Sequence, residues 1–244
     1  MRLIALGALL VACAAAMGRA AVVFDAHGFE PPRYEEGKLV GQNGWVQKNN
    51  TSSTAEVQKD FVRSGSQALR LKSAIGQNHF FPPVNFVPAM GDLIVVECDI
   101  ARTASSTPSF GYFIDVIGTD GQRVARAGLG RDGTNIRAIR TLPTGNSPAN
   151  GIVYAPMQWV HFEIQLNFSN HTWELLIDGV PSGSGLPMNN VFAPGIMSAD
   201  VQVASFLAST DTGYFDNYVV RTVPAPGAIV LVAIGVIVAA RRKR

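Results

Sequence analysis

Two carboxylates near the centre of the chain, Glu97 and Asp99, have the spacing of a catalytic pair on one strand. Residues at alternate positions of a β-strand point to the same face, so the two side chains are neighbours if this segment is extended. Retaining cleavage of a glycosidic bond uses two carboxyl groups about 5–5.5 Å apart, one as nucleophile and one as acid. The apolar residues around them favour a plainer interpretation, with both carboxylates on the solvent face and Val96, Cys98 and Ile100 facing the core.

The segment Glu97–Arg102 resembles the Glu-x-Asp-x-x-Glu strand of the family-16 glycoside hydrolases. The resemblance implies that the last position supplies the acid, but this chain has Arg102 there. A guanidinium stays charged, so it cannot protonate a leaving group. We therefore expect no catalytic residues and no enzyme, and we keep a polysaccharide-active enzyme, a glycoside hydrolase or a lyase, as the alternative function.

The other residues that could bind a metal or take part in catalysis are scattered along the chain. The four histidines are His27, His79, His161 and His171, and no His-x-x-x-His or Cys-x-x-Cys spacing occurs. A transition-metal site is therefore not indicated, and we interpret these histidines as surface or turn residues. Neither a Gly-rich phosphate loop nor a Ser-His-Asp order is present, so nucleotide binding and nucleophilic hydrolysis lack support.

Charge is divided between the middle of the chain and its two ends. All 18 acidic residues lie between Asp25 and Asp216, whereas seven of the 20 Lys and Arg residues lie outside that stretch. The middle therefore has a net charge of −5. We exclude a nucleic-acid partner that requires a basic surface, because the excess positive charge belongs to the ends.

The elements that position these residues read as strands. In Trp159–Phe168 apolar and polar residues alternate, and the pattern resumes after a polar turn until Asp178-Gly179, which predicts an antiparallel hairpin over Trp159–Ile177. Two further Asp-Gly turns separate three short runs into a meander, whose strands are predicted at Tyr112–Ile117, Arg123–Leu129 and Asn135–Arg140.

Three other segments complete the prediction for the middle of the chain. Leu93–Ile100 and Phe110–Ile117 carry apolar residues on both faces, so we place them inside the sheets. Thr141–Pro156 contains three prolines and two glycines, which predicts a surface loop. Aromatic residues in or beside loops are candidates either for stacking on sugar rings or for the core: Tyr34, Trp45, Tyr112 and Tyr154.

These pieces resemble a concanavalin A-like (laminin G-like) jelly-roll over most of Phe24–Arg221, with GSQALRLKS, GDLIVVECDIAR and GYFDNYVVRTVP in the family's usual order. We therefore predict an all-β fold, a jelly-roll β-sandwich over residues 21–222. The resemblance implies that the first and last strands lie side by side, which brings Asp25 near Asp216. It also implies a structural calcium ion there, since calcium prefers oxygen ligands. Alternatively, Asp216 and Asn217 only turn and cap the last strand. No other cofactor is indicated.

The N-terminus has the anatomy of a secretory signal. Arg2 precedes Leu3–Ala16, fourteen residues without a charge, and small residues follow up to Ala20. We predict a signal helix over residues 1–20 that is removed on export. Leu10–Cys13 also resembles a bacterial lipobox, which is the alternative. Removal of the signal leaves Cys98 alone, so we expect no internal disulfide and interpret this cysteine as a small buried apolar residue.

The C-terminus reads as a membrane anchor. Gly227–Ala240 is an uncharged run of fourteen residues that spans about 21 Å as a helix, less than the ~30 Å hydrocarbon core of a bilayer. The chain then closes on four basic residues, which stop translocation and stay on the cytoplasmic side: Arg241, Arg242, Lys243 and Arg244. We predict a transmembrane helix that holds the exported domain at the membrane.

Residues 223–244 resemble the PEP-CTERM sorting signal, which has a Pro-x-Pro motif, an apolar helix and an Arg-rich end. Pro224, Ala225 and Pro226 take the motif positions, and Ala225 replaces the family's usual Glu. The resemblance implies an exosortase partner that cuts near this motif. The predicted protein is thus an exported, non-catalytic component of the cell surface or extracellular matrix. Its β-sandwich is expected to be either an adhesive module or a glycan-binding one, with a polysaccharide as the candidate partner.

Overall fold

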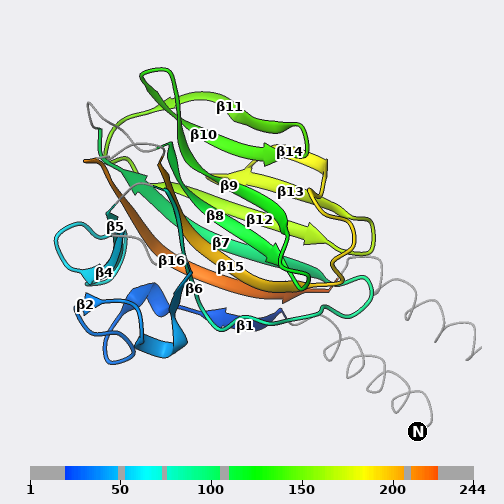
Figure 1. Cartoon of the computed structure of the whole chain (residues 1–244), viewed down its shortest axis with the longest axis horizontal. Coiled ribbons are helices and arrows are strands. Elements are labelled where there is room, and N and C mark those ends of the chain that lie inside the picture. The colour runs from blue at the N-terminus through cyan, green and yellow to red at the C-terminus, as the bar shows by residue number, and fades with distance from the viewer. Residues whose placement is uncertain (1–19, 49–52, 73–75, 105–109, 206–209, 225–244) are drawn as a thin grey trace, which may run out of the picture.

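The computed structural model describes residues 20–48, 53–72, 76–104, 110–205 and 210–224. Within these ranges the chain forms a sandwich of two antiparallel sheets, accompanied by two short 3-10 helices, η1 (His27–Phe29) and η2 (Gln42–Gly44). Figure 1 views the two layers face-on. The predicted all-β sandwich is confirmed. The predicted terminal helices fall in residues 1–19 and 225–244, outside the described ranges.

The first layer of the described chain is a nine-stranded sheet in the order β14-β13-β12-β7-β16-β5-β4-β2, with β1 also paired to β16. Its strands are β1 (Ala21–Asp25), β2 (Gly37–Lys38), β4 (Thr54–Gln58), β5 (Ala68–Lys72), β7 (Leu93–Arg102), β12 (Val160–Asn167), β13 (Thr172–Ile177), β14 (Val180–Pro187) and β16 (Thr212–Val223).

The second layer of the described chain is a seven-stranded sheet in the order β11-β10-β9-β8-β15-β6-β3. Its strands are β3 (Val46–Lys48), β6 (Gly76–Phe81), β8 (Gly111–Gly118), β9 (Arg123–Asp132), β10 (Asn135–Leu142), β11 (Gly145–Tyr154) and β15 (Ile196–Ser205). Strands β7 and β8 have neighbours on both sides, so both predicted interior strands are confirmed.

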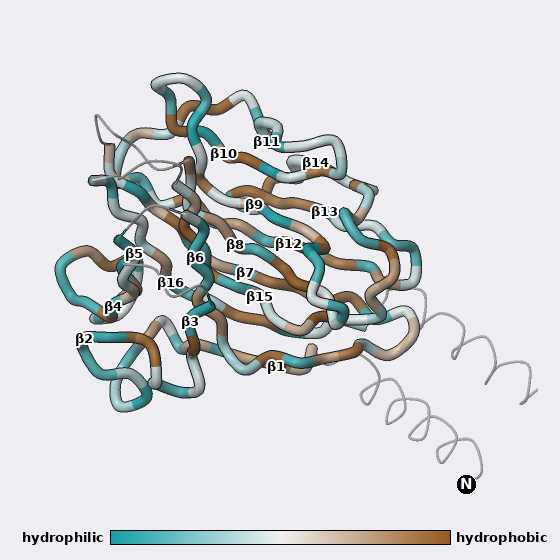
Figure 2. Tube along the Cα trace, viewed as in Figure 1, coloured by the Kyte–Doolittle hydropathy of each residue, from teal (hydrophilic) through white to brown (hydrophobic). Residues whose placement is uncertain are grey.

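Alternating hydropathy forms these strands because one face of each sheet packs on the other sheet. In β12 every second residue is buried, and β12 pairs with β13 as the predicted hairpin. The predicted meander is confirmed as β8, β9 and β10, which pair in sequence order. The alternation of apolar and polar residues along the strands is visible in Figure 2.

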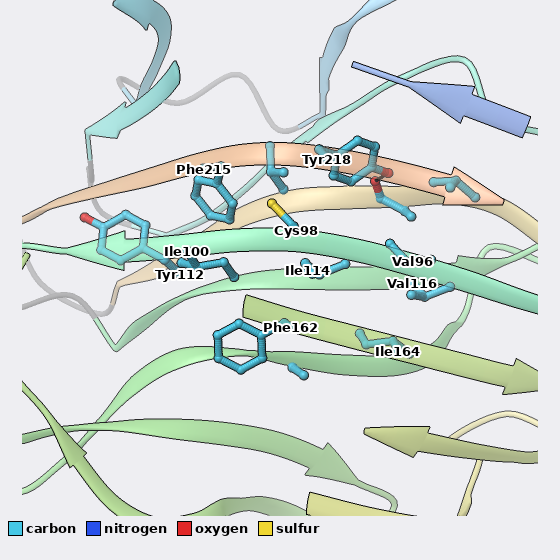
Figure 3. Close-up of a cluster of buried hydrophobic side chains, with 14 of the residues drawn as sticks. Val96, Cys98, Ile100, Tyr112, Ile114, Val116, Phe162, Ile164, Phe215 and Tyr218 are labelled. Atoms are coloured by element: carbon cyan, nitrogen blue, oxygen red, sulfur yellow. Dashed lines mark hydrogen bonds between the residues drawn. The ribbon is translucent and has the colours of Figure 1, made fainter. Parts of the chain in front are cut away.

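The core lies between the two layers. Figure 3 shows inward side chains of β7 and β8 packed with residues of β12 and β16. Val96, Cys98 and Ile100 of β7 are fully buried there, as predicted. Cys98 is a free thiol, and burial raises its pKa well above the usual value, so it stays protonated and unreactive.

The predicted loop over Thr141–Pro156 is wrong, because most of it is the edge strand β11, paired with β10. Gly145 opens this strand with a φ of 121°, a conformation that glycine adopts at little cost. Pro148 is tolerated because an edge strand does not need every N–H for pairing, and the register shifts between Arg137 and Ile139 opposite it. Counting prolines misled the prediction because it ignored this edge position.

The first and last strands lie side by side, as the jelly-roll resemblance implies. Ala21 of β1 is opposite Thr222 of β16, so the described chain starts and finishes at one end of the sandwich. In Figure 1 this is the end from which β1 starts and toward which β16 points.

Candidate functional site

The outer face of the seven-stranded sheet carries a row of polar side chains across four adjacent strands. In β15 and β8, Asp200 is directly opposite Asp115, and Asp115 is opposite Arg126 of β9. One step along the same face, Gln202 of β15 is opposite His79 of β6. The residues between them along each strand fill the core, so this alternation directs the polar set away from the nine-stranded sheet.

Asp115 lies at the centre of this row and is fully buried. Its Oδ2 accepts hydrogen bonds from Arg126 Nη2 at 2.6 Å and Arg123 Nη2 at 3.0 Å, and its Oδ1 accepts from Arg123 Nε at 2.5 Å. Burial acts to raise the pKa of this carboxyl, but the two guanidinium groups outweigh it and hold the pKa below the usual value. Asp115 is therefore an anion that fixes two arginines on the sheet.

His79 connects this anion to the neighbouring strand. Its Nδ1 is 2.9 Å from Asp200 Oδ2 and 3.8 Å from Asp115 Oδ2. Burial raises the pKa of Asp200, a hydrogen bond with His79 lowers it, and the charge of Asp115 raises it further, so the net shift is upward. A buried carboxyl with a raised pKa, in contact with an imidazole, is an arrangement that can exchange a proton.

Gln202 completes the environment of His79. Its Nε2 lies 3.0 Å from His79 Nε2 and 3.3 Å from Gln77 Oε1, while its buried Oε1 has no hydrogen-bond partner among the described residues. An amide that donates to Nε2 requires the imidazole proton on Nδ1, toward Asp200. The opposite amide orientation would instead accept a hydrogen bond from an Nε2–H group. The site thus accommodates a proton on either ring nitrogen of His79.

Chemically, this cluster combines proton transfer with recognition of polar groups. Arg123 reaches solvent, with 29% of its side chain exposed, and His79 is 11% exposed. A guanidinium pairs with carboxylate or hydroxyl oxygens, and an imidazole next to a carboxyl transfers protons. We refer to His79, Asp115, Arg123, Arg126, Asp200 and Gln202 as the sheet-face cluster.

This cluster was not apparent from the sequence. His79 was expected at the surface or in a turn, whereas the residue is buried in β6. A usable signal was present, because Asp115 and Asp200 each interrupt an apolar strand at a position where a charge is costly unless it is paired. The pairing of His79 with Asp200 joins residues 121 positions apart, which spacing along the chain cannot reveal.

The carboxylates singled out by sequence lie in the other sheet. Glu97 is on the outer face of the nine-stranded sheet, where Arg221 Nε donates to its Oε1 at 2.8 Å. Asp99 accepts from Asn217 Nδ2 at 2.7 Å and lies 3.2 Å from His161 Nδ1. Glu97 and Asp99 share the outer face of the sheet as predicted, but neighbouring side chains cover Asp99, which is only 5% exposed.

Arg102 does not share a face with those carboxylates. Strand β7 pairs with β12 without a bulge, so residue 102 falls on the inward side, and its side chain is 1% exposed. The guanidinium forms a buried ion pair with Asp211 and lies over the ring of Tyr112. These contacts give Arg102 a structural role in the core.

The two carboxylates predicted to hold calcium are engaged separately. Asp25 is opposite Val219 in the β1–β16 pair, and its Oδ1 accepts a hydrogen bond from His27 N at 2.6 Å. Asp216 Oδ2 accepts from the backbone N–H groups of residues 63 and 64, at 3.0 and 3.1 Å, and its Oδ1 from that of Asn217.

Both carboxylate oxygens of Asp216 and Oδ1 of Asp25 thus accept N–H bonds and have less capacity left for a cation. Within the described ranges no group of three or more His, Cys, Asp or Glu residues is arranged to hold a metal ion. Burial raises the pKa of Asp216 to about 6. A calcium ion at Asp25 and Asp216 stays a prediction.

The four aromatic residues offered for sugar stacking are all in the core. Tyr34, Trp45 and Tyr112 are fully buried and Tyr154 is 4% exposed. Trp45 Nε1 donates to the hydroxyl of Tyr34 at 2.9 Å, which satisfies both polar groups inside the sandwich. Core packing is therefore their function.

The sorting residues fall at the limit of the described chain. Pro224 follows β16 directly, whereas Ala225, Pro226 and the basic residues 241–244 lie outside the described ranges. Across the residues that are described, no helix has both the length and the apolar character needed to cross a membrane.

Comparisons with known proteins identify the fold but no family. No family model matches the chain, and no curated protein matches it. Among solved structures, a sialidase matches with a TM-score of 0.54 and 12% identity over 76% of this chain. The match covers 17% of the sialidase, so this chain corresponds to a small part of that protein.

Two further structures match over most of their length. The globular domain of T. cruzi calreticulin has a TM-score of 0.52 and 12% identity, covering 82% of this chain and 91% of that one. The cellulose-induced protein Cip1 has a TM-score of 0.50 and 15% identity, covering 75% and 92%. Weaker matches, with TM-scores of 0.40 to 0.46, include a xylan-binding domain, an endo-β-1,4-glucuronan lyase and an alginate lyase.

These matches correct the expectation that the chain is not an enzyme. The sandwich is shared with part of a sialidase, so this fold does not exclude an enzyme. Arg102 replaces a carboxyl in β7, which removes an acid from one strand of the nine-stranded sheet. The sheet-face cluster lies on the opposite layer and is unaffected by that replacement.

Proposed function

We propose that this chain is an exported protein that binds polysaccharide at the sheet-face cluster of a concanavalin A-like jelly-roll. The observation that carries the proposal is the buried row His79–Asp200–Asp115–Arg126 on an outward sheet face. Stability does not require such a row, because apolar residues of similar volume often stabilise a protein as well as buried ion pairs do. The partly exposed guanidinium of Arg123 there suits the hydroxyl and carboxyl groups of sugars.

Cleavage of the polysaccharide is the second candidate function. It is favoured by the contact between His79 and Asp200, because this pair provides a proton donor and a proton acceptor 2.9 Å apart. The arginines beside them would stabilise negative charge that develops on a substrate. The same residues serve both functions, so one set of variants tests them together.

The test is a panel of neutral and acidic polysaccharides presented to the full chain in detergent micelles. His79→Gln removes the imidazole and should weaken retention at least about tenfold, as expected for loss of a hydrogen bond to the ligand. His161→Gln is the matched control, because it changes the other histidine–aspartate pair. Equal binding by both variants and the wild type would refute the site.

Turnover is measured on the same samples, as new reducing ends or as unsaturated products. Cleavage that is abolished by His79→Gln but retained by His161→Gln would establish the enzyme. Retention without cleavage would establish a binding module.

Sorting to the cell surface is the second part of the proposal. The apolar run 227–240 and its basic end would hold the exported domain at the membrane until an exosortase cuts near Pro224–Pro226. Replacing both prolines should trap the full-length chain at the membrane, and mass spectrometry of released protein would detect the cut. Recovery from the medium of intact protein ending at Arg244 would contradict processing.

A further inference from the structure

Two loops at one end of the sandwich expose a group of large apolar side chains. Met90 is 91% exposed and Phe192 is 87% exposed, beside Val87 at 55% and Val191 at 44%. These residues border a hollow of about 390 Å³ that Phe168 also lines. Contiguous exposed apolar groups on a soluble domain mark a surface that contacts something else. We call these four exposed residues the apolar end.

The apolar end lies where the described chain starts and finishes. Leu93, which begins β7 just after Met90, is opposite Val223, the last residue of β16. Phe86, which precedes the first loop, pairs with Ile196, which follows the second. In Figure 1 the loops before β7 and after β14 lie on the side where β1 begins and β16 ends.

Chain length then places the apolar end close to the predicted anchor. Only residues 224–226 separate β16 from the apolar run 227–240, and three extended residues span about 10 Å at most. Two of the three are prolines, so this connection is stiff. The apolar run is also shorter than a hydrocarbon core, which draws the sandwich toward the bilayer.

We propose that the apolar end rests in the headgroup layer of the bilayer while the chain is anchored, with Met90 and Phe192 inserted. The inference rests on the proposed sorting tag, because the tag supplies the anchor. Among the described residues that line the hollow, Asp92 is the charged one and there is no Lys or Arg. The surface therefore suits zwitterionic lipids and would be repelled by anionic ones.

A second copy of the chain fits this surface less well. Stable interfaces between proteins involve about 20–30 residues on each side, far more than four exposed side chains. The tether, in contrast, brings the bilayer to these loops in every anchored molecule.

Quenching of tryptophan fluorescence by lipid tests whether the apolar end contacts the bilayer. The full chain is reconstituted into phosphatidylcholine vesicles that contain brominated lipid, which quenches tryptophan on contact. Phe192→Trp reports on the apolar end. Val180→Trp is the control, because residue 180 is 63% exposed but begins β14 at the opposite end of the β13–β14 hairpin.

The expected result is that full chain floats with the vesicles and that Phe192→Trp is quenched several-fold more strongly than Val180→Trp, relative to the wild type. If the chain floats but the two variants are quenched equally, the contact of the apolar end with the bilayer is disproved and anchoring by the sorting tag is not affected. If the emission of Phe192→Trp shifts to the blue without quenching, the apolar end contacts protein and not the bilayer, and the proposal is disproved. If the chain fails to float, both the membrane anchor and the bilayer contact of the apolar end are disproved.

Discussion

The outer faces of the two sheets carry the same pair of residue types in different surroundings. On the nine-stranded sheet His161 faces Asp99, with Nδ1 3.2 Å from Oδ1 and 32% of the imidazole exposed. On the seven-stranded sheet His79 faces Asp200 at 2.9 Å and is 11% exposed. One pair lies close to water, and the other lies in a buried polar row.

The surroundings reverse the direction of the aspartate pKa. Burial acts to raise the pKa of Asp99, but hydrogen bonds with His161 and Asn217 bring it below the usual value. Burial also raises the pKa of Asp200, where the contact with His79 does not offset burial and the nearby charge of Asp115. Crowding by a second carboxylate thus contributes to the raised pKa of Asp200, whereas separate hydrogen-bond partners lower the pKa of Asp99.

Asp115→Ala is expected to have the largest effect on stability among the variants that test this contrast. The substitution leaves Arg126 buried without its counter-charge, so we expect a loss of about 3–5 kcal/mol in the free energy of unfolding. Asp99→Ala is the matched control, and its loss should be about 1–3 kcal/mol, because its partners are closer to water. Urea denaturation followed by circular dichroism measures both. Equal losses would show that the two faces are energetically alike.

Asp216 sharpens the comparison because it is as buried as Asp115 but has backbone amides in place of guanidinium groups. Burial raises its pKa to about 6, above the unfolded value near 3.9, so the folded state favours the protonated carboxyl. That stability is present below about pH 4 and is lost as pH rises through 6. The loss is at most about 3 kcal/mol.

The measurement compares urea unfolding of wild type and Asp216→Asn from pH 4 to pH 7. The variant cannot titrate and should lack this component of the pH dependence. Calcium and a chelator are added in parallel at pH 7, because a bound ion would stabilise only the wild type. Identical pH profiles would disprove the raised pKa.

Much of the fold was predictable because it depends on local patterns. The β12–β13 hairpin and the β8–β10 meander follow from alternation and Asp-Gly turns, which act over a few residues. The site was not predictable in the same way. His79 and Asp200 meet only because β6 and β15 pair, and no local signal specifies that pairing. Pro148 similarly misled the prediction of β11, because its cost depends on which strand is at the edge.

A smaller effect is expected from the pair of His161 and Asp99 on the nine-stranded sheet. The hydrogen bond with Asp99 is the main cause that raises the pKa of His161. The stability that this raised pKa contributes is present below the unfolded value near 6.5 and is lost as pH rises through the folded value. The lowered pKa of Asp99 gives a contribution that is lost as pH falls below about 4. The stability difference between wild type and His161→Gln should therefore be greatest between about pH 4 and 6.5. A difference that does not vary with pH would disprove the pairing.

The smallest effect is expected at Glu97, the residue that its spacing first marked as a nucleophile. Its ion pair with Arg221 is partly exposed, with 22% and 28% of the two side chains accessible, so solvent screens it. A double-mutant cycle with Glu97→Gln and Arg221→Gln should give a coupling free energy of about 0.2–1 kcal/mol that shrinks in high salt. Any polysaccharide cleavage should survive Glu97→Gln, because this side chain lies on the layer opposite the sheet-face cluster. Loss of cleavage with Glu97→Gln would move the chemistry to β7 and reverse the assignment of the two faces.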